Sequence, residues 1–215
     1  MRPPNFPETQ VTIAESRPRS HGEVVLMVGT QKGAFLVWSA ASRSTWHLEG
    51  PHFPGESVYA LALDQRGGRH RTLAATRSFH WGSVVRWSDD FGKSWTAPDR
   101  QNVKFPAGLD ASLVQVWQIM QGRVSEPDVL YAGVEPAALF ESRDAGETWE
   151  MVRGLYDNED RPKWQPGGGG LCLHTIVVDP DDSNRMGIAV SSGGFYRTDD
   201  GGNNWNAPNI GDRKS

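Results

Sequence analysis

The chain has 215 residues, 37% of them hydrophobic, and carries 22 Lys and Arg against 26 Asp and Glu, for a formal net charge of −4. This length and a mean hydropathy of −0.54 fit an ordinary soluble protein and leave no apolar stretch for a membrane span. A weakly acidic chain has no general electrostatic attraction for nucleic acid or anionic lipid. We therefore expect neither nucleic acid nor a membrane as a partner.

The two ends of the chain are polar. Residues 1–23 contain four prolines and several charges but no apolar run, which predicts a flexible leader that is neither a signal peptide nor a strand. Residues 208–215 are mostly polar, and we expect them to form a polar tail. The single cysteine, Cys172, excludes an intrachain disulfide and permits a reducing compartment. Without an export signal we expect a cytoplasmic protein.

Between these ends, short apolar runs alternate with turn residues, and no amphipathic helical pattern is found. The runs predict β-strands in four groups, of which the first has three strands and each of the others four. The groups span 24–50, 57–97, 113–152 and 171–207. The predicted strands are 24–28, 34–39 and 45–48; 58–64, 72–76, 83–87 and 94–97; 113–120, 129–133, 138–142 and 148–152; and 171–179, 186–190, 194–198 and 204–207.

An eight-residue pattern, S-x-D-x-G-x-[ST]-W, punctuates these groups, and we call it the box. Asp can accept hydrogen bonds from backbone N–H groups further along, Gly can adopt a positive φ, and Trp supplies an apolar plate, so we interpret the box as a structural turn and not as catalytic. A worn copy ends at Trp46, and the steps between successive box tryptophans are 49, 54 and 56 residues. The box residues are Ser88, Asp90, Gly92 and Trp95; Ser142, Asp144, Gly146 and Trp149; and, in a near copy, Thr198, Asp200, Gly202 and Trp205.

The box and its spacing resemble the Asp-box proteins, also called bacterial neuraminidase repeat proteins. The spacing matches one four-stranded blade with its connections. The resemblance therefore implies an all-β, partial β-propeller with about four antiparallel blades. Residues 132–140 and 164–175 look most like bacterial proteins labelled sialidase-like or glycosyl hydrolase, which implies a glycan as ligand. The family also includes receptors and assembly factors, so the fold does not fix the function.

The strand count leaves the propeller ring open. The first group lacks its innermost strand, and nothing after Trp205 supplies one from the C-terminus. Complete family members are nearly twice this length, so one interpretation is a fragment of a longer propeller. Because an open edge exposes unpaired backbone groups and invites pairing with another chain, the other hypothesis is a homodimer that completes the ring.

Candidate functional residues gather in the connections on the face opposite the boxes, where propellers usually bind ligands over the central channel. Sugar hydrolysis needs two carboxyl groups that flank the scissile bond, and we assign Glu135 and Asp110 to these roles. Aromatic faces can stack on sugar rings, and an arginine can hold an anionic group. The predicted ligand-binding residues are His80, Trp81, Trp117, Arg161, Trp164 and His174, within a carboxylate-rich rim that includes Asp157, Glu159 and Asp160.

Several of these residues also have a plainer interpretation. Glu135 can simply hydrogen-bond a turn, and Asp110 can simply order its loop. His174 lies in a predicted innermost strand, where a satisfied core histidine is an alternative to a general base. His80 has no second His or Cys at ligand spacing, so we predict no metal, and no motif indicates a cofactor.

The glycine run 167–170 is followed by a strand and not by a helix, which argues against a phosphate-binding loop. We interpret the glycines as allowing close backbone approach at the channel mouth. Cys172, in the apolar strand that follows, is predicted to be a buried thiol without nucleophilic duty.

Sialidases, by the resemblance, carry an Arg-Ile-Pro motif, an arginine triad and a late tyrosine nucleophile. The motif is absent, and three arginines of this chain cannot be matched to the triad. Two functions remain open: a sialidase-like glycosyl hydrolase-type propeller that acts on or binds a glycan, and a non-catalytic scaffold that binds protein or glycan. The separation of Glu135 and Asp110 discriminates between them, because glycoside hydrolysis requires roughly 5 to 10 Å between carboxyl groups.

Overall fold

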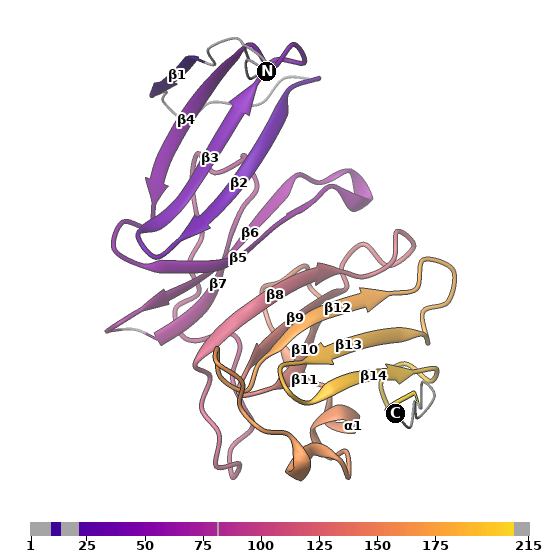
Figure 1. Cartoon of the computed structure of the whole chain (residues 1–215). Helices are drawn as coiled ribbons and strands as arrows, with labels where there is room; N and C mark the ends of the chain where they lie inside the picture. Colours follow the sequence, from indigo (N-terminus) through magenta and orange to yellow (C-terminus); the bar gives the residue numbers. More distant parts are fainter. Residues whose placement is uncertain (1–9, 14–21, 81, 209–215) are drawn as a thin grey trace, which may run out of the picture.

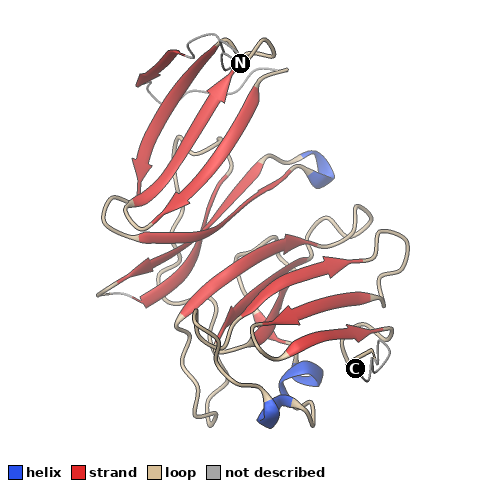
Figure 2. Ribbon diagram, viewed as in Figure 1, coloured by secondary structure: helices blue, strands red, loops and turns tan. Residues whose placement is uncertain are grey.

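The computed structural model describes residues 10–13, 22–80 and 82–208, which form four consecutive β-sheets (Figures 1 and 2). We call these sheets blades 1 to 4. Neighbouring strands within each blade are antiparallel, apart from one parallel pair in blade 1. The strand order is β1 (Gln10–Ile13), β4 (Thr45–His52), β3 (Gly33–Ser39), β2 (Val24–Thr30) in blade 1; β5 (Ser57–Asp64), β6 (Arg71–Ser78), β7 (Gly82–Ser88) in blade 2; β11 (Glu150–Met151), β10 (Ala138–Ser142), β9 (Leu130–Glu135), β8 (Gln115–Gln121) in blade 3; and β12 (Leu173–Val178), β13 (Met186–Val190), β14 (Gly194–Thr198) in blade 4.

The blades pack face to face in chain order. Strand β2 contacts β5, β5 contacts β8, and β8 contacts β12, so the inner strands of successive blades adjoin one another. Alternate residues of each strand fill the junctions. Leu73, Val85 and Phe140 are fully buried between blades 2 and 3, and Leu139 and Ile188 between blades 3 and 4. Each such side chain contributes about 1.5–3 kcal/mol by burial, so the junctions hold the fold together.

The three boxes adopt one hydrogen-bonded turn, which joins the third strand of a blade to its outer edge. The Ser142 hydroxyl donates to Asp144 Oδ1 (2.8 Å) and accepts from the Gly146 N–H (2.8 Å). Asp144 also accepts from the backbone N–H (2.9 Å) and the hydroxyl (2.5 Å) of Thr148. Turns 88–95 and 198–205 repeat these bonds. The three turns therefore share one hydrogen-bond pattern.

The predicted strands agree with the structure to within a few residues at most ends, and 138–142, 186–190 and 194–198 agree at both ends. Two predicted fourth strands, 94–97 and 204–207, shrink to single bridges, Trp87 with Thr96 and Arg197 with Asn206. The worn box joins β3 to β4, so β2 occupies the place of a second strand in blade 1. The described part of blade 1 therefore has no strand inside β2, as the strand count predicted.

The prediction of a leader without strands needs correction. Strand β1 lies inside the predicted leader and pairs in parallel with β4, with Val11 opposite Trp46. It was missed because it is only four residues long and its partner lies 35 residues away. The rest of the leader and residues 209–215 lie outside the described residues. One-turn helices occur at α1 (Arg153–Tyr156), η1 (Arg66–Gly68) and η2 (Arg161–Lys163), all too short to show an amphipathic period. No helix in the described ranges is long and apolar enough to cross a bilayer.

Candidate functional site

Three successive inner strands carry a β-bulge at the same place, and each bulge inserts one aromatic residue. The pairing of β5 with β6 skips Tyr59, that of β8 with β9 skips Trp117, and that of β12 with β13 skips His174. A bulged residue leaves the regular ladder, and its side chain is re-aimed. We call Tyr59, Trp117 and His174 the bulge residues. Tyr59 is 41% exposed, His174 is exposed and Trp117 is partly buried.

Two of the bulge residues touch each other beside a predicted site carboxylate. The ring centroids of Tyr59 and Trp117 lie 5.4 Å apart, with an interplanar angle of 58°. The Trp117 indole N–H donates to Glu135 Oε2 (3.2 Å). Glu135 ends β9 on the side opposite the box turn of blade 3. The carboxylate therefore fixes the orientation of the indole ring.

The glycine run closes over this carboxylate. Gly167 and Gly170 exchange backbone hydrogen bonds of 3.1 and 3.0 Å. Gly170 has a φ of +92°, and a Cβ on it would overlap Glu135 Oε1. A Cβ on Gly169 would lie 3.6 Å from the Trp117 ring. The interpretation of these glycines as points of close backbone approach agrees with this geometry.

A pocket of about 520 Å³ opens at the end of blade 2 that is opposite its box turn. It is lined by Ser57 of β5, by Arg77 and Phe79 at the β6–β7 turn, and by Leu113 and Val114 before β8. Ser57 lies two residues from Tyr59, and the Val114 N–H donates to the Glu135 carbonyl oxygen (2.8 Å). The pocket and the aromatic pair are therefore built from the same strand, β5, and from the segment that leads into β8.

The remaining predicted residues of this face are less closely connected. Asp110 is exposed on the loop before β8 and, within the described ranges, has no hydrogen-bond or ion-pair partner. No recorded contact brings Asp110 to Glu135. His80 is exposed in the β6–β7 turn, with its ring 5.4 Å from that of Phe79. Trp81 lies outside the described residues.

Arg161 and Trp164 belong to the interior of the long connection between blades 3 and 4. Trp164 is 6% exposed, and its indole N–H donates to the Tyr196 hydroxyl (2.8 Å). The Arg161 guanidinium lies over the Tyr156 ring (3.9 Å to the centroid) and donates to the Ala137 carbonyl oxygen (3.1 Å). Burial holds the pKa of Arg161 below its ordinary value. Both side chains are occupied in packing this connection, so we leave them out of the candidate site.

His174 and Cys172 have different environments although they are neighbours in the chain. The exposed His174 has Nδ1 2.8 Å from Thr175 Oγ1, so it is not the core histidine considered above. Cys172 is 4% exposed, and burial raises the pKa of its thiol, as expected for a thiol without a nucleophilic role. The described residues contain no cluster of three metal-ligating side chains.

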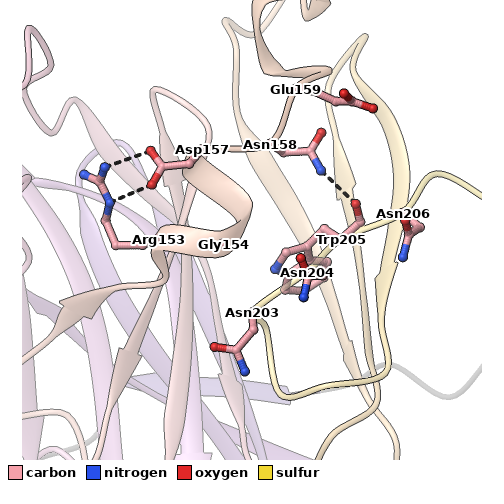
Figure 3. A pocket seen from close by; sticks show the side chains of 9 residues that line it. All are labelled: Arg153, Gly154, Asp157, Asn158, Glu159, Asn203, Asn204, Trp205 and Asn206. Atoms are coloured by element: carbon pink, nitrogen blue, oxygen red, sulfur yellow. Dashed lines mark hydrogen bonds and ion pairs between the residues drawn. The ribbon is translucent and has the colours of Figure 1, made fainter.

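Two members of the predicted carboxylate rim lie on the box side instead. Asp157 and Glu159 line a polar pocket of about 610 Å³ between α1 and the fourth-blade box turn (Figure 3). Gly154 of α1 packs so tightly on this turn that a Cβ would overlap the Asn203 carbonyl oxygen. The Asn158 side chain donates to the Trp205 carbonyl oxygen (2.7 Å). The rim prediction was wrong here because β11 has only two residues, so the connection after it begins near the boxes.

The sequence reasoning missed Tyr59. The available signal was the alignment of the inner strands, in which Val58-Tyr59, Val116-Trp117 and Leu173-His174 occupy equivalent places. Each pair has a buried aliphatic residue followed by an aromatic one. One strand with such a pair carries no information about a site. The recurrence of the pair at the same place in three inner strands is the informative feature.

The fold is a partial β-propeller, nearly all-β, with bulge-presented aromatic residues on the face opposite its box turns. Among solved structures, YCF48 from Cyanidioschyzon merolae matches 83% of the chain and 52% of its own length, with a TM-score of 0.50 and 13% identity. The GH74 enzyme of Niastella koreensis matches 85% of the chain and 27% of its own length, with a TM-score of 0.48 and 17% identity. Identities this low concern the fold alone.

In sequence, the chain is similar to two fungal enzymes, and no protein-family model matches it. It is 27% identical over 119 residues to a probable oligoxyloglucan-reducing end-specific xyloglucanase of Neosartorya fischeri, a match that covers 55% of the chain and 13% of that protein. It is 30% identical over 81 residues to the oligoxyloglucan-reducing end-specific xyloglucanase of Emericella nidulans, which covers 37% of the chain and 9% of that protein. The chain thus corresponds to a small part of either relative, and its similarity to glycoside-hydrolase propellers is weak.

Proposed function

We propose that this propeller binds a neutral oligosaccharide on the face opposite the box turns, across the bulge residues and the adjoining pocket. The observation that carries the proposal is the Tyr59–Trp117 ring pair, held beside Glu135 by the indole hydrogen bond. Sugar rings have apolar faces that pack on aromatic rings, while their hydroxyl groups need polar partners. Arg77 and Ser57 in the pocket supply such partners.

The same geometry favours binding over hydrolysis. Glu135 Oε2 is engaged by the indole N–H, and Oε1 lies against Gly170. A hydrolase needs a second carboxyl group across the substrate, and Asp110, exposed on the loop before β8, stays the candidate for that role in the alternative. We therefore assign Glu135 the role of positioning Trp117, and the hydrolase stays the alternative.

Xyloglucan oligosaccharides are the first probe, because the two fungal relatives are named for enzymes that act on them. We expect isothermal titration with such an oligosaccharide to show saturable binding. Trp117→Ala removes a stacking surface and should weaken binding roughly tenfold or more. Glu135→Gln keeps an acceptor oxygen for the indole and should retain most of the affinity.

Trp205→Phe is the matched control, because Trp205 is 4% exposed in a box turn away from the proposed site. It should leave the affinity unchanged while the protein stays folded by circular dichroism. Release of sugar by the wild type that Glu135→Gln abolishes would contradict the binding proposal and support the hydrolase. Equal affinity of the wild type and Trp117→Ala for the oligosaccharide would show that the aromatic pair takes no part in binding.

A further inference from the structure

Blades 1 and 4 each have one sheet face that packs against no other described blade. On blade 1 this face, which we call the leading face, presents Leu26 and Val28 of β2, which are 50% and 41% exposed. On blade 4 the corresponding trailing face presents Val177 and Phe195, which are 55% and 44% exposed. Exposed apolar clusters of this kind mark interaction surfaces.

The leading face has the pattern of a buried junction. In blade 1 the first residue of the worn box, Ser39, pairs with Val24 of β2. Leu26 and Val28 follow Val24 by two and four residues. The equivalent residues are Ala132 and Val134 in blade 3, counted from Ser142, and Ile188 and Val190 in blade 4, counted from Thr198. These four counterparts are at most 3% exposed, because each packs against the preceding blade.

The trailing face shows the same relation. Phe195 lies three residues before the first box residue of blade 4, Thr198. Its counterparts at that place in blades 1, 2 and 3 are Leu36, Val85 and Leu139, which are 2%, 0% and 0% exposed because the next blade covers them. Phe195, Val177 and Met186 also line an apolar hollow of about 320 Å³. A hollow of this kind accepts branched aliphatic side chains such as those of the leading face.

We propose that a second copy of this chain covers both faces, with the leading face of each copy packed on the trailing face of the other. Every internal junction has this arrangement, and one chain carries both halves of it. Two copies related by a twofold axis then satisfy all four end faces and close a ring of eight blades, within the range known for propellers. The inner strands with their bulge residues then surround one shared channel.

Light scattering on the 215-residue chain tests this proposal, with an expected mass twice the 23.7 kDa of one chain. Phe195→Asp and Leu26→Asp place a charge on the trailing and leading faces, and each variant alone should be monomeric. Mixing the two should restore a dimer, because each variant keeps the face that the other lacks. Val124→Asp is the control, since Val124 is 83% exposed in the β8–β9 connection, and it should stay dimeric.

A monomeric wild type would overturn the proposal. The proposal would also be overturned if only one of the two face variants were monomeric. That result would mean that two leading faces, or two trailing faces, pack on each other. Growth into large assemblies would contradict ring closure, since a head-to-tail contact that does not close forms filaments. Circular dichroism checks that each variant is folded, which is expected because all three changes are at exposed positions.

Discussion

Asp144 is the residue on which the third box turn depends. It accepts hydrogen bonds from the backbone and hydroxyl of Thr148, from the Ser142 hydroxyl and from the Glu147 N–H. Asp144→Ala leaves these donors without their acceptor and should lower the free energy of unfolding by about 1–3 kcal/mol. Thermal denaturation should show a midpoint several degrees lower. Asp110→Ala, on an exposed loop, should leave the midpoint unchanged, and an equal fall in both variants would contradict this account.

The box carboxylates also predict how stability depends on pH. Hydrogen bonds from the Asn204 side chain and backbone, and from Thr198, lower the pKa of Asp200 to about 2. At Asp144 burial raises the pKa, but hydrogen bonds from Thr148 and Ser142 outweigh it and the net pKa is lowered. A carboxyl with a lower pKa in the folded than in the unfolded state, where it is about 3.9, stabilises the fold above that value.

This stabilisation disappears as the pH falls toward about 2, through the pKa of folded Asp200. We therefore expect the calorimetric midpoint to fall between about pH 4 and pH 2 because of these groups, and to be insensitive to them near neutrality. In Asp200→Asn the acid-induced fall should be shallower. A variant that loses stability with pH as steeply as the wild type would show that the carboxylate is not responsible.

At the level of elements, the position of the bulge residue Trp117 beside Glu135 depends on Gly170. Gly170 has a φ of +92°, and a Cβ on it would overlap the Glu135 carboxylate. Gly170→Ala should displace Glu135, free the Trp117 indole, and weaken both the fold and oligosaccharide binding. Gly168 is the matched control, because nothing lies within 4 Å of a Cβ there. We expect Gly168→Ala to behave as wild type in titration and thermal denaturation; similar behaviour of both variants would contradict the role assigned to Gly170.

Strand positions could be predicted from the sequence because apolar runs and box turns are local patterns. Non-local features could not: β1 pairs with a strand 35 residues away, and β11 has only two residues. Because β11 is so short, Asp157 and Glu159 lie on the box side and not on the predicted face. Trp164 was expected at the surface because its burial against Tyr196 depends on the next blade. Strand order predicted that Glu135 lies on the side opposite the boxes, but its hydrogen bond with Trp117 required the structure.

At the level of the whole molecule, the four described blades leave apolar side chains exposed on the leading face of blade 1 and on the trailing face of blade 4. The proposed ring and the proposed sugar site are independent, since the aromatic pair lies within one chain, between blades 2 and 3. A monomer that binds oligosaccharide would support the proposed site and contradict the proposed ring. A dimer without affinity for sugar would support the ring and contradict the site.

The most direct test of the central claim is a crystal structure of the protein with a bound xyloglucan oligosaccharide. We expect a sugar ring packed on Tyr59 and Trp117, with Glu135 still accepting the indole hydrogen bond and sugar hydroxyl groups in the pocket beside Arg77. A sugar bound elsewhere, such as in the polar pocket between α1 and the fourth-blade box turn, would contradict the proposed site.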